Sequence, residues 1–366
     1  MEDELLTSAE VARLLRVHPK HLYRLLRRGL PGHRLGRGHW RFARAEVLAW
    51  MGSRTRLPPQ GSAELDAQLV APATAASRPQ GRRVVLGRVG ERWVAHPVDA
   101  RAHRSADGIA DGLAADATAR PSRTRVGLLR PLAEMDSNVL VAGCAPVLGL
   151  LLDRAGEGGP GRAHWVPCNS RAALDMLGRG HVHVAGIHLE GATAHDDHAT
   201  LARAVAGPDA RLFRMVRWRT GLALSAAHAQ LDLEGLLEPS VRWVVREAGA
   251  GVSAVLERAL RSVGAGLLDP DRRSIVTLAS DHDAVAQTVR MGLADVGPCI
   301  EPVARAHGLR FLPLQEERFD LVVTADSLAH PHVGRLLRQL DDAVLRREVG
   351  ALGAYDASAL GQAATP

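Results

Sequence analysis

A group of basic and polar side chains lies close together near the N-terminus. Its members are Lys20, His21, Tyr23, Arg24, Arg27 and Arg28, followed by Arg37 and Arg41. Such side chains donate hydrogen bonds to phosphate oxygens and guanine edges, and a single helix that carries them fits the major groove. We therefore predict that these eight residues contact double-stranded DNA.

A helix-turn-helix is predicted to position these side chains. Thr7 and Glu10 have the spacing of a capping box, so a first helix should begin there. Pro19 suits the first position of a second helix, and Gly29 favours its end after Arg28. Both helices repeat leucine or valine at helical spacing, which gives each of them one apolar face.

A glycine turn with Arg37 at its tip should form a wing after the second helix. Two short alternating strands, residues 33–35 and 39–42, flank this turn. A third helix over residues 43–51 would then close the small core.

Residues 5–51 resemble the winged helix-turn-helix of the excisionase and MerR-like group. The matching motifs are Leu6-Thr7-Ser8-Ala9-Glu10-Val11-Ala12, Arg34-Leu35-Gly36, Trp40-Arg41-Phe42 and Glu46-Val47-Leu48-Ala49-Trp50. The resemblance implies that this stretch binds DNA. The alternative is a basic helical hairpin that binds protein.

The positive charge of the chain is concentrated in the same region. The 366 residues carry a formal net charge of +6 at pH 7. Residues 1–54 hold eleven basic and five acidic residues, and the remaining chain holds 35 of each sign. An excess of basic residues confined to one module is the electrostatic footprint expected of a nucleic-acid-binding domain.

The number and spacing of the cysteines indicate the redox state of the cellular compartment. Cys144, Cys168 and Cys299 are far apart and form no C-x-x-C pair, which argues against a disulfide framework or a structural zinc site. The first residues are acidic, and the apolar runs are too short to span a bilayer. We expect a cytoplasmic protein with no membrane contact, no cofactor and no bound metal.

The chain after the basic module divides into further segments. Residues 1–54 form the DNA-binding domain, and residues 55–81, rich in proline, alanine and serine, should be a linker with a short helix near residues 65–70. Residues 82–132 contain short strand-like runs and should be β-rich. They weakly resemble the C-terminal β-domain of the molybdopterin molybdotransferase family through residues 93–98, 106–108 and 128–132. An unrelated β-extension is the alternative.

Residues 137–358 show repeated units of an apolar strand, a small-residue turn and a helix. Strands are expected at residues 139–142, 165–168, 182–188, 241–245, 275–278 and 294–298. Apolar strands alternating with helices predict two α/β lobes with parallel sheets. The fold class is therefore multidomain, with a small helical winged helix-turn-helix, a β-rich middle segment, a two-lobed α/β domain and a tail at residues 359–366.

This α/β region resembles the periplasmic-binding-protein-like domain that follows helix-turn-helix modules in bacterial regulators and is related to molybdate-binding proteins. The motifs are Ala185-Gly186-Ile187-His188-Leu189, residues 246–251, His282-Asp283-Ala284-Val285-Ala286, residues 292–297, Glu317-Arg318-Phe319-Asp320-Leu321-Val322-Val323 and residues 352–356. The resemblance implies that a ligand binds between the lobes.

The ligand is expected at the carboxyl ends of the strands, where helix N-termini present N–H groups. The candidate residues are Gly143, Cys144, Asn169, Ser170, His188, Arg246, Gly249, Gly251, Ser253, His282 and Asp320. The family usually has hydroxyl residues at two of these turns, where this chain has Cys144-Ala145-Pro146 and Ala248 with Ala250. Fewer hydroxyl donors weaken the case for a small oxyanion.

Single residues among these candidates also have a structural interpretation. His188 can be a hydrogen-bonded core histidine, His282 can cap its helix, and Asp320 can pair with Arg318. The spacing of His195, Asp196, Asp197 and His198 could hold a metal, although such a loop cluster is more often incidental. G-x-S-x-G, P-loop and H-E-x-x-H motifs are absent from the sequence, so we do not expect an enzyme.

These observations predict a one-component transcriptional regulator that binds DNA as a homodimer and senses a small polar or anionic molecule, with molybdate or tungstate as candidates. Two alternatives stay open. One is a molybdenum-related binding protein with secondary DNA binding, and the other is an architectural DNA-binding protein whose ligand site is empty.

Overall fold

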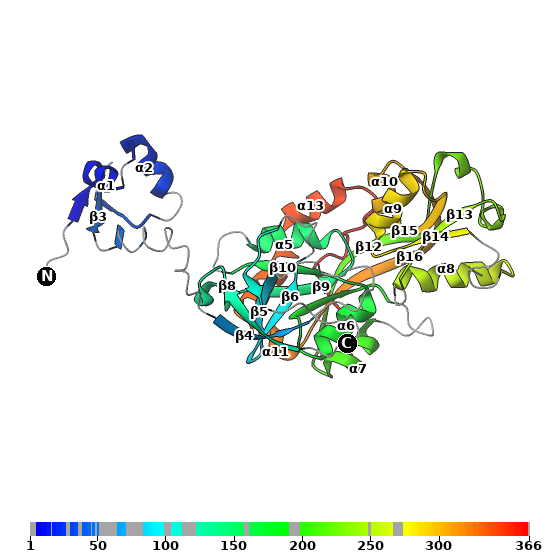
Figure 1. The fold of residues 1–366 in the computed structure, drawn as a ribbon, viewed down its shortest axis with the longest axis horizontal. Coiled ribbons are helices and arrows are strands. Elements are labelled where there is room, and N and C mark those ends of the chain that lie inside the picture. Colours follow the sequence, from blue (N-terminus) through cyan, green and yellow to red (C-terminus); the bar gives the residue numbers. More distant parts are fainter. Residues whose placement is uncertain are drawn as a thin grey trace. The chain divides into compact units, whose positions relative to one another are not determined.

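The computed structural model describes residues 5–15, 17–26, 30–35, 39–44, 46–47, 50, 64–70, 83–98, 104–111, 122–156, 161–189, 198–247, 250–265 and 274–364. The chain forms two compact units, residues 1–63 and 64–366, which Figure 1 shows in sequence colours. Among the described helices, none has the length and apolar character needed to cross a membrane.

The first unit contains the predicted helices and strands. Its elements are β1 (Leu5–Thr7), α1 (Ser8–Leu14), α2 (Pro19–Leu26), β2 (His33–Leu35) and β3 (His39–Ala43), and the three strands pair in the order β1-β3-β2. The capping box is confirmed, because the Thr7 backbone N–H donates to Glu10 Oε2 at 2.7 Å and the Glu10 N–H donates to Thr7 Oγ1 at 3.4 Å. Strand β1 was not predicted.

The apolar faces of this unit meet in one core. Val11 on α1, Leu22 on α2, Phe42 on β3 and Val47 are all buried there. Of the predicted third helix, residues 44, 46, 47 and 50 are helical, while the rest of it lies outside the described residues.

The second unit begins with a small closed barrel. Its strands are β4 (Glu64–Leu69), β5 (Arg83–Val89), β6 (Arg92–Pro97), β7 (Gly108–Ala110) and β8 (Ser122–Leu128), closed in the order β4-β6-β5-β7-β8. The predicted helix at residues 65–70 is wrong, and the predicted linker contains a strand. Strand β4 pairs with β8 along its whole length, and Ala67 and Leu69 are buried in the barrel core, so tertiary pairing decided its conformation.

The α/β domain follows the barrel. Its first three strands are β9 (Val139–Gly143), β10 (Ala163–Pro167) and β11 (Val184–Ile187), and β13 (Arg242–Arg246), β14 (Ser274–Ala279) and β15 (Val296–Ile300) form the second group. Within each group the strands pair in parallel. These six strands lie at or within two residues of the predicted positions.

Two long strands join the groups. Strands β12 (Arg211–Leu224) and β16 (Arg310–Val323) pair antiparallel with each other. Strand β16 pairs with β11 near its C-terminal end. Strand β12 pairs with β15 at the opposite end of the β12–β16 ladder. The two expected parallel sheets are therefore halves of one sheet, whose strand order is β10-β9-β11-β16-β12-β15-β13-β14. In Figure 1 the long strands β12 and β16 run through both halves.

Helices and short turns complete the domain. The helices are α4 (Leu132–Met135), α5 (Leu148–Gly156), α6 (Ser170–Gly178), α7 (His198–Ala206), α8 (Gly251–Ser262), α9 (His282–Arg290), α10 (Glu301–Ala306), α11 (Ala325–Leu328), α12 (Pro331–Gln339) and α13 (Ala343–Ala351). Two 3₁₀ turns, η1 (Ala226–His228) and η2 (Gly235–Leu237), precede β13, and the predicted tail contributes β17 (Ala363–Ala364), which pairs with β12.

Buried histidines connect the barrel to the α/β domain. His96 Nε2 on β6 donates to the His181 carbonyl at 2.8 Å, and His183 Nε2 donates to the Arg88 carbonyl at 2.9 Å. Burial lowers the pKa of His96 to about 4 and that of His183 to about 4, although each hydrogen bond to a carbonyl opposes the shift. Both rings are therefore neutral in the folded protein near neutral pH.

We predict that the second unit loses stability as the pH falls from about 6.5 to 4. In that range the unfolded chain binds protons at His96 and His183 while the folded chain does not, so each contributes a loss of up to about 1.4 kcal/mol per pH unit. Urea unfolding at several pH values measures this slope. His96→Gln, which keeps an N–H donor but does not titrate, should reduce it, and the same exchange at exposed His21 is the control.

Candidate functional site

Helix α2 presents part of the predicted DNA-contacting surface. Lys20, His21 and Arg24 are exposed on it, while Leu22 points into the core. Arg41 on β3 is partly buried and donates through Nη1 to the Trp40 carbonyl at 3.0 Å, so it is less free than the α2 residues. The Tyr23 side chain, Arg27, Arg28 and Arg37 lie outside the described residues.

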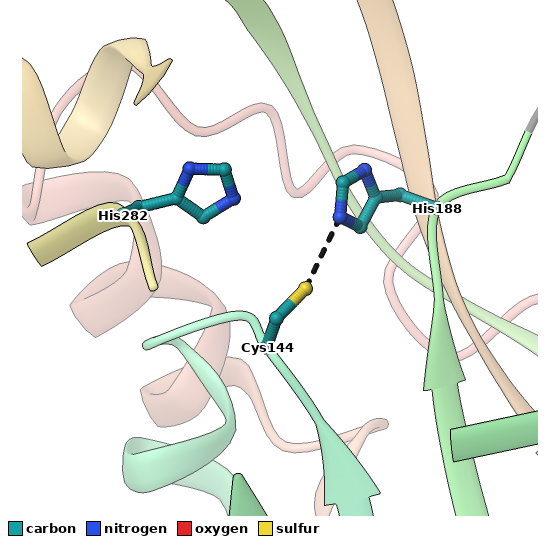
Figure 2. A group of neighbouring side chains, drawn as sticks. All are labelled: Cys144, His188 and His282. Atoms are coloured by element: carbon teal, nitrogen blue, oxygen red, sulfur yellow. Dashed lines mark hydrogen bonds between the residues drawn. The ribbon is translucent and has the colours of Figure 1, made fainter. Parts of the chain in front are cut away.

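A compact group of three side chains lies inside the α/β domain. Cys144 directly follows β9, His188 directly follows β11, and His282 is the first residue of α9. All three are buried, and their Sγ and ring nitrogen atoms lie within 4.8 Å of one another. Figure 2 shows the three side chains converging, with Cys144 Sγ 3.1 Å from His188 Nε2. We call this group the Cys-His-His cluster.

The two long strands hold the far side of the His188 ring. Glu317 Oε2 on β16 lies 3.1 Å from His188 Nδ1, and Thr220 on β12 donates its hydroxyl to the same Glu317 oxygen. The Trp218 and His188 rings meet edge to face, with their centroids 5.3 Å apart. The ring is therefore fixed in orientation from both long strands.

Neighbouring charges set the ionisation of these groups. Burial opposes charge on Cys144, yet His188, through its charge and hydrogen bond, lowers the pKa of the thiol below its usual value. Burial likewise opposes charge on His188, but Cys144 and Glu317 raise its pKa to about 10. The pKa of Glu317 is lowered, because His188 outweighs the effect of burial. His188 is therefore an imidazolium that a carboxylate orients, and its charge favours the thiolate form of Cys144.

His282 has a different environment. It is 1% exposed, and within the described part of the chain neither of its ring nitrogens has a hydrogen-bond partner. Burial, then the charges of Arg246 and His188, lower its pKa well below the usual value, so the ring is neutral. A neutral imidazole with a free lone pair therefore lies beside the Cys144 sulfur and the His188 ring.

The remaining predicted ligand residues surround the cluster in part. Ser170 Oγ accepts a hydrogen bond from the His188 backbone N–H at 3.1 Å. A Cβ on Gly251 would lie 2.5 Å from the His188 carbonyl oxygen, so α8 can approach His188 only with glycine there. Arg246, at the end of β13, makes hydrogen bonds of 3.0 and 2.9 Å to the carboxylate of Glu247.

Two of the helix N-termini expected to bind the ligand are already capped. Asn169 Oδ1 accepts from the Ala172 N–H at 2.9 Å at the start of α6, and Asp281 Oδ1 accepts from the Ala284 N–H at 2.7 Å at the start of α9. Asn169 is therefore a helix cap. Helix α8 differs, because Ala250 before it makes no side-chain cap.

Asp320 does not join the cluster. Its Oδ2 lies 2.7 Å from His198 Nδ1, and Arg214 and Arg318 donate to the same oxygen. The expectation that Asp320 pairs with Arg318 is confirmed. His198 Nε2 also accepts from the Leu189 N–H, so both nitrogens of this ring have partners within the protein. His198 is therefore not available as a ligand for the metal site considered at residues 195–198.

Three further predicted positions are placed as follows. Gly143 ends β9 directly before Cys144, and its carbonyl accepts from Trp165 Nε1 at 2.7 Å. Ser253 lies in the first turn of α8 and is partly buried. Gly249 and residues 190–197, which include His195, lie outside the described residues.

Sequence reasoning missed Glu317 and Thr220. The signal for Glu317 was present, because it lies in the quoted motif at residues 317–323 and alternates with Asp320 across β16. Only the fold shows which of these two carboxylates faces His188. Thr220 carries no such signal, since the long strand β12 was not predicted.

The geometry of the cluster suits two kinds of chemistry. A thiolate, an imidazole and an orienting carboxylate in this order activate a nucleophile. The same thiolate and imidazoles are also borderline-soft metal ligands, and an imidazole whose other nitrogen contacts a carboxylate is the usual form of a metal-binding histidine.

Comparison with known families locates two domains. A family model described as a helix-turn-helix domain matches residues 5–55, and one described as a PBP superfamily domain matches residues 153–341. These two matches do not identify the excisionase or MerR-like subtype or a relation to molybdate-binding proteins.

Two curated proteins are similar to parts of the chain. "Uncharacterized protein YvgK" of Bacillus subtilis (strain 168) is 27% identical over 196 residues, which cover 51% of this chain and 61% of that protein. The chain thus spans less than two thirds of this relative. The "Uncharacterized protein in ferredoxin 2Fe-2S gene 5'region" of Clostridium pasteurianum is 33% identical over 85 residues, 23% of this chain and 75% of that protein.

Solved structures align with this chain at low similarity. A putative phosphate ABC transporter substrate-binding protein from Clostridium perfringens, solved with bound phosphate, aligns with a TM-score of 0.46 and 9% identity over 60% of this chain and 98% of that chain.

We predict that Glu317→Gln lowers the pKa of His188 from about 10, because the amide removes the negative charge that stabilises the imidazolium. Histidine-selective NMR titration of the metal-free protein measures it. Asp320→Asn, which removes a buried carboxylate on the same strand that contacts His198 instead, is the matched control and should leave the His188 titration in place. An unchanged His188 pKa in Glu317→Gln would contradict the assigned contact.

Proposed function

Because the chain belongs to the PBP superfamily and carries a helix-turn-helix domain before that region, we propose that it is a one-component DNA-binding regulator that responds to a small polar or anionic ligand. The observation that carries this proposal is the exposed basic row on α2, in a unit separate from a domain with a buried polar cluster.

The DNA-binding part of the proposal rests on exposure and charge. Lys20, His21 and Arg24 share the solvent face of α2, while the leucines on the other face hold the helix on its core. A helix held this way can place its donors against base edges and phosphates without losing its own packing. We propose that Arg27, Arg28 and the Arg37 wing extend this surface.

The ligand-sensing part of the proposal rests on the two long strands, β12 and β16. Glu317 on β16 contacts His188, and Thr220 on β12 donates to Glu317, at the point where the two sheet halves join. The N–H groups of the first turn of α8 lie beside His188, since Gly251 packs against its carbonyl. A ligand bound here would contact both halves and would change their relative orientation.

Dimerisation would convert that change into altered DNA affinity. A two-fold dimer presents two recognition helices to half-sites about one helical turn apart, so a change in their separation or orientation changes the fit. We propose a homodimer on this ground. Molybdate and tungstate, which the sequence resemblance implies, are the first ligands to test.

We predict that the full-length protein binds the DNA upstream of its own gene and that binding weakens steeply with salt, because arginine and lysine displace counterions from phosphates. Lys20→Ala/Arg24→Ala should weaken binding by about 2 kcal/mol or more, at about 1–3 kcal/mol for each base-reading contact. Fluorescence anisotropy over a salt series measures both effects.

The control is Arg203→Ala/Arg261→Ala, which removes the same charge from exposed positions in the second unit. It should bind like the wild type. Equal losses in the two double variants would show that only net charge matters and would overturn the recognition-helix assignment. If molybdate raises thermal stability of a protein that does not bind DNA, the molybdenum-related binding protein is the better function. If no ligand changes the affinity for DNA, the result supports the alternative of an architectural DNA-binding protein whose ligand site is empty.

A further inference from the structure

The geometry points to a metal site: we infer that Cys144, His188 and His282 bind one thiophilic transition-metal ion, Zn²⁺ or Cu⁺. The sequence predicted no metal there, because the three ligands lie 44 and 94 residues apart in no recognisable spacing. The fold brings them together from the ends of β9 and β11 and the start of α9 (Figure 2).

The separations of the donor atoms fit a tetrahedral ion. Metal bonds of about 2.3 Å to sulfur and 2.0–2.1 Å to nitrogen place such donors roughly 3.3–3.6 Å apart. The observed contact from Cys144 Sγ to His188 Nε2 is 3.1 Å, and all three donor atoms lie within 4.8 Å. Small rotations of the side chains are enough to reach the bonded geometry.

His282 is the second, independent observation. Leaving a buried polar group without a partner destabilises the folded protein, so a core histidine is normally hydrogen-bonded. His282 is 1% exposed and, among the described residues, has no partner at either ring nitrogen. Its ring lies beside that of His188, with centroids 6.1 Å apart. An ion bound to His282 satisfies a group that the protein itself leaves unpaired.

Glu317 supplies the outer contact that such a site needs. Metal-binding histidines donate the other ring N–H to a carboxylate, which fixes the tautomer and orients the ring. Glu317 Oε2 accepts from His188 Nδ1 at 3.1 Å, so Nε2 is the nitrogen that faces Cys144. The nearby cation Arg246 is already paired with Glu247 and so does not oppose a second positive charge strongly.

The ligand set selects the class of metal. One thiolate and two imidazoles favour Zn²⁺ or Cu⁺ over Mg²⁺ and Ca²⁺, which prefer oxygen. Three protein ligands leave a fourth position for water or for a small exogenous ligand. Because a metal ion binds the deprotonated thiol and the neutral imidazole, Zn²⁺ takes the place of the hydrogen bond between Cys144 Sγ and His188 Nε2.

An ion at this position would tie together the two halves of the sheet. Cys144 and His188 follow strands of the first half, and His282 begins α9, which packs on β13 and β15 of the second. If the regulator function proposed above holds, this ion is its effector or holds the sensing domain closed. The binding itself does not depend on that function.

The test is Zn²⁺ binding by the full-length, metal-stripped protein in competition with a fluorescent chelator. We expect one Zn²⁺ per chain. Glu317→Gln should weaken binding by roughly 10- to 100-fold. Cys144→Ser and His282→Leu, which remove a ligand, should weaken it more, while Cys168→Ala, at a buried cysteine outside the cluster, should not change it. Co²⁺ in place of Zn²⁺ should give a thiolate charge-transfer band that Cys144→Ser abolishes.

His282→Leu also separates a ligand from a structural histidine. Because it removes an unpaired buried polar group, it should leave the metal-free protein at least as stable as the wild type in urea unfolding. Loss of stability together with unchanged Zn²⁺ affinity would overturn the metal site. Alkylation of Cys144 at the same rate with and without Zn²⁺ would also overturn the metal site. That result would instead favour Cys144 as an activated nucleophile.

The DNA assay distinguishes this inference from the proposed function. Stoichiometric Zn²⁺ binding by a protein that does not bind DNA supports the metal site and overturns the regulator. If the protein binds Zn²⁺ and DNA, and Zn²⁺ changes the affinity for DNA in the wild type but not in Cys144→Ser, the metal site and the regulator function are both supported. Stoichiometric Zn²⁺ binding that leaves DNA affinity unchanged supports the site and overturns the ion's role as effector.

Discussion

The antiparallel pairing of β12 with β16 is the interaction on which the α/β domain depends. These two fourteen-residue strands are the only described connection in the sheet between the parallel group β9–β11 and the parallel group β13–β15. The ladder shifts register between Arg214 and Val216 and again between Thr220 and Gly221. Such irregularities bend and twist a ladder locally, so the join between the two halves departs from regular pairing in this segment.

The buried polar groups near this segment depend on one another. Cys144, His188 and Glu317 form a chain of contacts in which each charge has a partner, as burial requires. Removing one member leaves another charged and unpaired, which is more costly than removing an exposed ion pair. His282 stands beside this chain without a protein partner. That contrast is the physical reason to regard the group as a binding site rather than as internal packing.

The two units divide charge and chemistry between them. The net charge of +6 arises within residues 1–54, whereas the rest of the chain has balanced charges. In the second unit most of the described acidic and basic groups of the interior are paired, as Asp107 is with Arg130 and His164 where the barrel meets the α/β domain. In the proposed regulator, long-range attraction to DNA would come from the first unit, and the second unit would recognise its ligand at short range.

The sequence alone determined the local elements. Thr7 and Glu10 began α1, the apolar runs gave the parallel strands, and the charge count located the basic module, because each of these depends on neighbours in sequence. The tertiary structure decided the rest. Pairing with β8 made a strand of residues 64–69, and the pairing of β12 with β16 turned the two expected sheets into one. It also chose Glu317 over Asp320 as the partner of His188 and joined Cys144, His188 and His282, since contacts between distant residues arise only when packed elements bring them together.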